Sequence, residues 1–336
     1  MRPFDYVRAA NVPDAVRAAS GEQGAPTAAR AQFIAGGTMM LDLMKLGSMQ
    51  PGVLVDVNAL ETRHGGIEAT PQRLRLGALV RMAQAADDAT VRRDYPVIAD
   101  TLNLAASAQL RNMASLGGNV LQRTRCQYFR EPGWSACNKR VPGSGCAALD
   151  GVNRQHAVLG VSERCIAEYP GDFAQALVAL RASVELFGPN GARTLPFEQL
   201  HRSADTPEVE TVLAPGELIT GFVVPAGPWT RRSAYVKVRD RESYAYALAS
   251  AAVALDMDRD TVREARIGLG GVAYRPWRAR EAEAMLAGKP LTEANAEMAA
   301  RAAYAGAQPR EHNRYKIELG RRTLVRALMQ VGSMQV

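Results

Sequence analysis

Short apolar runs alternate with helical stretches in the first part of the chain. Three runs have the length and composition of strands, and they lie at residues 4–7, 31–35 and 53–57. Two segments with apolar residues at helical spacing separate them, at residues 13–19 and 39–46. Pro13 in the first helical turn and Gly47 after the second helix are typical helix boundaries. This order predicts a subdomain of alternating strands and helices over residues 1–58.

The pattern continues less regularly to about residue 225. Strands are predicted at residues 74–76, 183–187 and 218–224, and helices at residues 82–86, 96–106 and 173–180. Gly188-Pro189-Asn190-Gly191 is typical of a hairpin turn after the second of these strands. We assign residues 59–225 to a second subdomain, so that the first domain spans residues 1–225. The Pro- and Gly-rich segment 225–228 is the candidate domain boundary.

The C-terminal part consists of strands followed by helices. The strands are predicted at residues 235–238, 245–255 and 262–269, and the helices at residues 278–286, 292–307 and 313–329. Strands and helices that are segregated along the chain indicate an α+β fold. We therefore predict a separate α+β domain at residues 229–336, in which helices cover a three-stranded antiparallel sheet.

Length and composition agree with a two-domain protein. The 336 residues suffice for two cores, and 47% hydrophobic with 22% charged residues is ordinary for a globular protein. No run of about 18 uncharged apolar residues occurs, so we expect no membrane span. The net charge of +7 comes from scattered arginines without a Lys/Arg block, so we expect no nucleic-acid partner. The N-terminus has no apolar h-region and no twin-arginine pair, so we expect no export signal on this chain.

Two diglycine segments are candidates for contact with a phosphate-bearing ligand. Gly36-Gly37-Thr38 lies between a predicted strand and a predicted helix, where backbone N–H groups point toward phosphate oxygens. Leu116-Gly117-Gly118-Asn119 repeats the diglycine, and the two turns could grip one pyrophosphate from opposite sides. An ordinary strand-to-helix turn is the alternative for each segment. Neither matches GxGxxG or GxxxxGK[ST], so a Rossmann fingerprint and a P-loop are both absent.

The cysteines are confined to one Pro- and Gly-rich segment. They are Cys126, Cys137, Cys146 and Cys165, spaced C-x10-C-x8-C-x18-C. This spacing is too wide for the paired knuckles of a zinc ribbon, and it differs from the C-x2-C-x2-C run of bacterial ferredoxins. Four soft thiolates on an irregular loop favour a [4Fe–4S] cluster. Structural zinc, two disulfides and unrelated free thiols are the alternatives.

No set of residues indicates substrate chemistry on this chain. No Ser/His/Asp constellation is apparent, and the histidines form no HExxH motif. They are His64, His156, His201 and His312. We therefore predict no catalytic residue and expect structural roles for the histidines, and we single out His156 because it lies among the cysteines.

Several longer segments carry a family resemblance. FIAGGTMMLDLMKL, SLGGN and GGVAYRPWRAREAE resemble the FAD-binding (medium) subunits of the molybdenum hydroxylases, a family that includes xanthine dehydrogenase and carbon monoxide dehydrogenase. QLRNMASLGGNVLQRTRCQYF and CNKRVPGSGCAALDGVNRQHAV are most similar to the flavin subunits of bacterial periplasmic aldehyde oxidoreductases, which carry an additional [4Fe–4S] cluster. The resemblance covers essentially the whole chain. It implies the two-subdomain FAD-binding fold of the vanillyl-alcohol-oxidase/CO-dehydrogenase flavoprotein type, followed by the C-terminal domain.

The resemblance also assigns roles to individual residues. The first FAD loop, which cradles the diphosphate, corresponds to Ile34, Ala35, Gly36, Gly37, Thr38 and Met39. The second loop corresponds to Ala106, Ser115, Leu116, Gly118 and Asn119. The family's motif aspartate corresponds to Asp172, an apolar contact to isoalloxazine or adenine to Ile219, and a lysine that contacts the flavin to Lys237. The cysteines would hold the [4Fe–4S] cluster in an insert at residues 122–166, close to FAD.

The implied function is electron transfer within a heterotrimer. A large subunit with the molybdenum-pterin cofactor and a small [2Fe–2S] subunit would supply electrons, and this chain would pass them to an external acceptor. The implied location is the periplasm, reached by co-export with a partner subunit, and otherwise the cytoplasm. The alternatives are a standalone flavoprotein oxidoreductase and a zinc-stapled nucleic-acid-binding protein.

Overall fold

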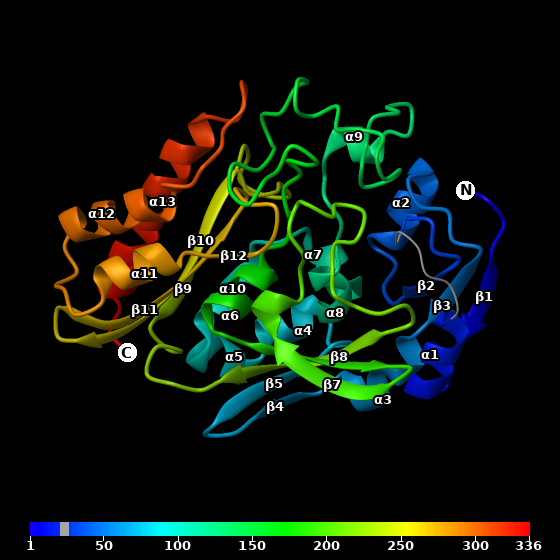
Figure 1. Cartoon of the computed structure of the whole chain (residues 1–336). Coiled ribbons are helices and arrows are strands. Elements are labelled where there is room, and N and C mark those ends of the chain that lie inside the picture. The colour runs from blue at the N-terminus through cyan, green and yellow to red at the C-terminus, as the bar shows by residue number, and fades with distance from the viewer. Residues whose placement is uncertain (21–26) are drawn as a thin grey trace.

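The computed structural model of the protein describes residues 1–20 and 27–336. Within these residues the chain forms three sheets, which follow one another along the molecule (Figure 1). The N-terminal sheet lies at one end, and the C-terminal sheet with its covering helices lies at the other. No helix in the described part of the chain is long and apolar enough to cross a membrane.

The N-terminal subdomain is built on a small parallel sheet of strand order β1-β3-β2. Its elements are β1 (Asp5–Arg8), α1 (Val12–Ala19), β2 (Ala31–Ile34), α2 (Met40–Leu46) and β3 (Val53–Asp56). Asn11 caps α1 by accepting a hydrogen bond from the backbone of Asp14. Gly47 ends α2 in the left-handed conformation, with φ of 76°. The predicted order of strands and helices is confirmed here.

The second subdomain follows, with an antiparallel sheet of order β4-β5-β8-β6-β7. The strands are β4 (Ile67–Ala69), β5 (Arg73–Gly77), β6 (Ser183–Gly188), β7 (Gly191–Pro196) and β8 (Leu218–Pro225). The helices are α3 (Glu61–His64), α4 (Met82–Asp87), α5 (Ala89–Asp94), α6 (Pro96–Asn103), α7 (Ala108–Met113), α8 (Leu116–Val120), α9 (Gln127–Arg130) and α10 (Phe173–Ala179), with 3₁₀ turns at Asn58–Leu60 and Phe197–Gln199. The predicted hairpin is present as β6 and β7, where Gly191 adopts φ of 90°.

The helix predicted at residues 96–106 is too long by three residues. It ends at Asn103, and Ala106 adopts a left-handed conformation with φ of 50°. The apolar pattern continues through Leu104 and Ala105, so periodicity alone gives no sign of this stop. The left-handed turn is what brings Ala106 to the cleft described below.

The C-terminal part contains an antiparallel sheet of order β12-β11-β10-β9. Its elements are β9 (Ser233–Val238), β10 (Ala249–Asp258), β11 (Thr261–Gly270), β12 (Trp277–Arg278), α11 (Arg280–Leu286), α12 (Glu293–Ala303) and α13 (Tyr315–Gly332). The prediction of three strands was wrong by one within the described residues. The additional strand, β12, is a pair of residues opposite Gly268 and Leu269, too short to produce an alternating pattern.

Buried side chains join the two parts of the chain. The largest core combines α4, α6 and α10 with the five-stranded sheet, and it also includes Tyr235, Ala252 and Ala254 from the C-terminal sheet. Helix α10 is buried along its whole length, as expected for a helix that is apolar on every face. It contacts α6 on one side and β10 and β11 on another. The candidate boundary at residues 225–228 therefore lies in a connection between two sheets that share packed side chains.

Candidate cofactor sites

A large cleft separates the N-terminal subdomain from the second one. Its volume is about 1190 Å³, somewhat above the range of about 300–1,000 Å³ typical of small-molecule sites. Most of the predicted FAD residues line it: Ile34, Ala35, Gly36, Gly37, Thr38, Met39, Ala106, Ser115, Gly118, Asn119 and Ile219. Leu116 does not line the cleft, because its side chain is fully buried in the main core.

The first glycine turn connects β2 to α2 and passes very close to the second glycine segment. Gly37 has φ of 71°, a conformation that side chains other than glycine rarely adopt. A Cβ on Gly36 would stand 1.9 Å from the carbonyl oxygen of Met113. Glycine at position 36 is thus required by the approach of two backbones. The approach brings the two diglycine segments to the same cleft.

The second glycine segment is one short helical turn, α8, instead of an open loop. Ser115 caps it, since its Oγ accepts a hydrogen bond from the Gly118 N–H at 3.2 Å. Gly117 donates its own N–H to the Ala78 carbonyl at 2.8 Å, and a Cβ there would meet the Ala78 side chain at 3.1 Å. These contacts fix the turn against the start of the second subdomain.

Arginines add positive charge to the cleft, and sequence reasoning missed them. Arg30, Arg123, Arg125 and Arg202 all line the cleft. Arg125 donates to Tyr246 Oη at 2.5 Å and pairs with Asp42 at 2.9 Å, which holds its guanidinium in place. Guanidinium groups suit phosphate oxygens. No sequence signal distinguishes these arginines from the many others, because they come from three separate irregular segments.

Asp172 and Lys237 meet each other and are absent from the residues that line the cleft. Lys237 Nζ lies 2.7 Å from Asp172 Oδ2, and both side chains are buried. Lys237 also donates to the Leu104 carbonyl at 3.0 Å, and Tyr235 Oη donates to Asp172 at 2.6 Å. The pair ties β9 to the start of α10 and to the turn that carries Ala106. A direct contact of either residue with the flavin stays a prediction.

The cysteines converge although their segments are irregular. Cys137 and Cys146 are paired in a short antiparallel bridge, and Cys146 and Cys165 are joined by a hydrogen bond between their sulfurs. Cys126 packs against the apolar clusters that contain Cys137 and Cys165, and it shares a third cluster with Cys146. All four, which lie in the described part of the chain, are free thiols, so the disulfide alternative is not observed. Across residues 1–20 and 27–336, no three His, Cys, Asp or Glu side chains are placed to hold a metal ion together.

The electrostatic surroundings of the cysteines differ from one thiol to the next. Burial raises the pKa of Cys126 to about 12, with smaller contributions from Cys137 and Cys146. A hydrogen bond between the thiols of Cys146 and Cys165 lowers the pKa of Cys146 and raises that of Cys165. His156 Nε2 lies 3.2 Å from Cys126 Sγ. Burial lowers the pKa of this histidine to about 4, so the ring is neutral near pH 7.

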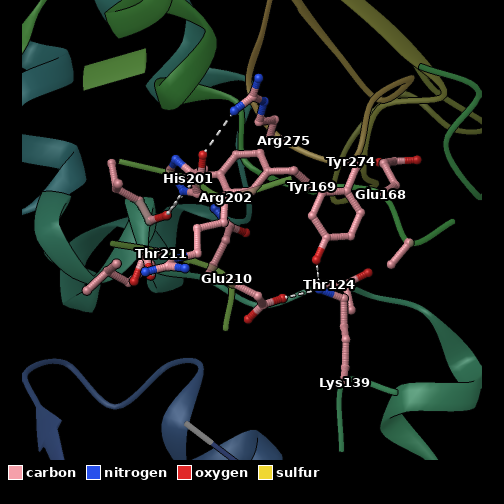
Figure 2. A pocket seen from close by; sticks show the side chains of 14 residues that line it. Thr124, Lys139, Glu168, Tyr169, His201, Arg202, Glu210, Thr211, Tyr274 and Arg275 are labelled. Atoms are coloured by element: carbon pink, nitrogen blue, oxygen red, sulfur yellow. Dashed lines mark hydrogen bonds and ion pairs between the residues drawn. The ribbon is translucent and has the colours of Figure 1, made fainter. Parts of the chain in front are cut away.

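A small cavity of about 40 Å³, lined by several charged and polar residues, lies beside both sites (Figure 2). It shares Leu121, Gln122, Arg202, Glu210 and Thr211 with the cleft lining. Its other lining residues include Lys139 and Ala167, which belong to the cysteine-bearing region and the segment directly after it. The cavity is large enough for ordered water.

Lys139 and Glu210 form a buried ion pair at the edge of this cavity. Lys139 Nζ lies 2.6 Å from Glu210 Oε1 and donates to Tyr274 Oη at 2.8 Å, as Figure 2 shows. Burial is the largest single influence and opposes the charge, but Glu210, Tyr274 and Cys165 together outweigh it and raise the pKa of Lys139. Arg123 Nε lies 2.6 Å from the other oxygen of Glu210, in an ionic contact without hydrogen-bond alignment. Two cations therefore surround one carboxylate between the cysteines and the cleft.

Comparison with protein families shows which family the chain belongs to. Residues 2–227 match the model described as the FAD binding domain in molybdopterin dehydrogenase. Residues 233–331 match the CO dehydrogenase flavoprotein C-terminal domain. The chain belongs to the FAD-binding medium subunits of the molybdenum hydroxylases. It is therefore an oxidoreductase subunit, and the resemblance inferred from the sequence is confirmed.

Individual medium subunits match this chain over nearly its whole length. The aldehyde oxidoreductase FAD-binding subunit PaoB of Escherichia coli (strain K12) is 44% identical over 98% of each chain. The carbon monoxide dehydrogenase medium chain of Hydrogenophaga pseudoflava is 27% identical, over 97% of this chain and 96% of its own. The solved structure of reconstituted CO dehydrogenase from Oligotropha carboxidovorans superposes with a TM-score of 0.76 at 25% identity, covering both chains completely.

Membership in this family shows that the chain is an FAD-binding subunit, and the chemistry of the cleft lining suits such a ligand. The lining supplies close backbone approach at the glycines and positive charge at the arginines, which suit a pyrophosphate. The predicted α+β fold of a CO-dehydrogenase-type flavoprotein is confirmed. The match also favours the flavin-subunit interpretation over the zinc-stapled nucleic-acid-binding alternative.

Proposed function

We propose that this chain is the FAD- and [4Fe–4S]-containing electron-transfer subunit of a heterotrimeric, molybdenum-dependent aldehyde oxidoreductase. The observation that carries the proposal is the combination of two sites in one chain, an FAD cleft and a gathering of free thiols beside it. The similarity to a subunit named for aldehyde oxidoreductase, at 44% identity over 98% of the chain, supports the substrate class.

The chain's own residues would hold FAD from two sides. The turn at residues 34–39 and the segment at residues 115–119 approach the diphosphate with backbone groups, and Ile219 offers an apolar contact. Arg123 and Arg125 lie on the cysteine side of the cleft, where they would balance phosphate charge. When bound, FAD accepts single electrons and releases one or two, which suits an exit point to an external acceptor.

The donor set fits a [4Fe–4S] cluster better than a single ion. In such a cluster each thiolate binds a different iron atom, so the sulfurs stand farther apart than around one zinc. The four thiols lie near one another, but among the described residues no three metal-binding side chains are close enough to bind a single ion. This wider arrangement agrees with a cluster. The buried Lys139 cation favours the negatively charged thiolate of Cys165. The cluster would supply one-electron storage close to the cleft.

The proposal includes partners and a location. Electrons would reach this chain from a molybdenum-pterin large subunit and a [2Fe–2S] small subunit. Medium chains of multi-subunit enzymes are among the relatives, which supports such an assembly. We propose the periplasm as the location, reached by co-export with a partner.

The test is purification of the complex from the native source through a tag on this chain. We expect a molybdenum-containing subunit and a [2Fe–2S] subunit to co-purify, and we expect the flavin absorption to bleach when an aldehyde is added without oxygen. Xanthine serves as the control substrate and should leave the flavin oxidised. A tagged chain that purifies alone and is reduced directly by its substrate would instead establish the standalone flavoprotein. Unchanged flavin absorption with every aldehyde would refute the substrate class.

A further inference from the structure

The histidine singled out by the sequence faces a cysteine sulfur. His156 Nε2 lies 3.2 Å from Cys126 Sγ, although the two residues are thirty positions apart in the chain. The ring is buried, at 5% exposure, and its other nitrogen, Nδ1, has no hydrogen-bond partner among the described residues. The sulfur of Cys126 is therefore the partner that the structure gives this ring.

The ring is held in position by several neighbours. The His156 N–H donates to the Asn153 carbonyl at 3.0 Å, and the fully buried Asn313 donates to the Ala157 carbonyl at 3.0 Å. Ala157, which directly follows His156, also donates its own N–H to the Ile166 carbonyl at 3.0 Å, beside Cys165. On one side the imidazole lies 6.1 Å from the ring of Tyr128. These contacts hold the backbone around His156, from which the ring places its Nε2 toward the sulfur.

We propose that His156 is a positioning residue that donates its Nε2–H to the Cys126 thiolate and raises the reduction potential of the cluster. The inference rests on the proposed [4Fe–4S] site. A thiolate ligand has no proton to give, so in a contact with imidazole it accepts and Nε2 donates. Reduction adds one electron and increases the negative charge on the ligand sulfurs. A donor at 3.2 Å therefore stabilises the reduced form more than the oxidised form.

The neighbouring cysteine shows how specific this contact is. Cys165 Sγ accepts a hydrogen bond from the backbone N–H of Ala167 at 3.5 Å, which no side-chain substitution removes. The contact at Cys126 comes from a side chain and is shorter. Substitution at position 156 therefore isolates one hydrogen bond at one ligand.

The decisive experiment is redox titration of the purified complex, followed by EPR, in three variants. His156→Phe keeps an aromatic ring beside Tyr128 and removes the donor. We expect its cluster to show a roughly tenfold shift toward the oxidised form at fixed solution potential, which is a fall of about 59 mV for one electron. His156→Gln, which restores an N–H donor, should fall less. His312→Phe, a histidine with a 40% exposed side chain, should leave the potential unchanged.

A second measurement keeps the inference testable if the Phe variant loses its cluster. Wild-type complex labelled with ¹⁵N-histidine should show a weak nitrogen coupling to the reduced cluster in pulsed EPR, as transmitted through a hydrogen bond. Absence of coupling would overturn the inference, and so would the strong coupling of a nitrogen bound directly to iron. Retained iron with equal potentials in the wild type and His156→Phe would refute the tuning role alone. Wild-type complex without iron at the cysteines would instead refute the cluster of the proposed function, and this inference with it.

Discussion

The FAD cleft and the cysteine insert are stabilised in opposite ways. The cleft is made where regular strands and helices end, and its shape depends on backbone contacts such as that of Gly36 with Met113. In the insert, side chains replace secondary structure: Asn138 donates to the Arg164 carbonyl at 2.8 Å and accepts from the Gly145 N–H at 3.0 Å. Buried backbone groups must find partners, and a loop finds them in polar side chains.

Two buried lysines form similar ion pairs in different parts of the molecule. Lys139 connects the insert to Glu210 and Tyr274, whereas Lys237 connects the C-terminal sheet to α10 and the 104–106 turn. Each cation is paired at 2.6 or 2.7 Å and is almost fully buried. The comparison teaches that steric substitutions should damage the cleft, and that charge substitutions should damage the insert.

The largest expected effect on cofactor binding is at the cleft, from Gly36→Ala. The added Cβ would stand 1.9 Å from the Met113 carbonyl oxygen, so the two turns must separate. We expect FAD affinity to fall by roughly tenfold or more, because overpacking typically costs about 1–3 kcal/mol and 1.4 kcal/mol is tenfold. Flavin content of the purified protein measures this. Gly306→Ala is the matched control, since no neighbouring atom in the described part of the chain lies within 4 Å of the added Cβ, and equal FAD occupancy in the two variants would contradict the account.

The largest expected effect on stability is in the insert, from the removal of a buried charge. Lys139→Met leaves Glu210 with one of its two cationic neighbours, and removing a partner from a buried pair costs about 3–5 kcal/mol. Chemical denaturation should show a loss of that size in the free energy of unfolding. Arg301→Met removes an exposed cation from a pair with Glu297 and should cost about 0.5 kcal/mol or less. Similar losses in both variants would show that the buried network has no special role.

The smallest effect is a pH dependence from His201, which lies in the cavity of Figure 2. Burial lowers its pKa to about 4, whereas the unfolded value is about 6.5. Between these values the unfolded chain binds a proton that the native state does not. Stability is therefore lost as pH falls through this window, by up to about 1.4 kcal/mol per pH unit. His201→Phe should flatten the slope of unfolding free energy between about pH 6.5 and about pH 4.5. Identical slopes in both proteins would contradict the assignment.

The sequence predicted regular elements well where glycine or periodicity marks them. The turn at Gly36–Gly37 and the hairpin before Gly191 carry local signals, since only a few residue types adopt those conformations. The stop after Asn103 and the short strand β12 have no such signal, because tertiary contacts determine them. Among the residues that line the cleft, Arg123 and Arg125 were missed, and the side chain of the predicted Leu116 lies in the core, since side-chain direction depends on the packing around α8.

Long-range pairing is the other feature that sequence could not provide. Lys139 and Glu210 are far apart in the chain, and nothing in either segment indicates that they meet. The spacing of the cysteines likewise says little about distance, because an irregular loop has no fixed periodicity. Their convergence depends on contacts such as that of Asn138 with Arg164.

The most direct test of the central claim is iron, sulfide and flavin analysis of the purified complex, compared between the wild type and Cys137→Ser. Both proteins should contain FAD, because the cleft does not depend on this thiol. The wild type should contain about four more iron and about four more sulfide per copy of this chain than the variant, as a four-thiolate cluster requires. Equal iron and sulfide in the two proteins, or zinc in place of iron, would contradict the account.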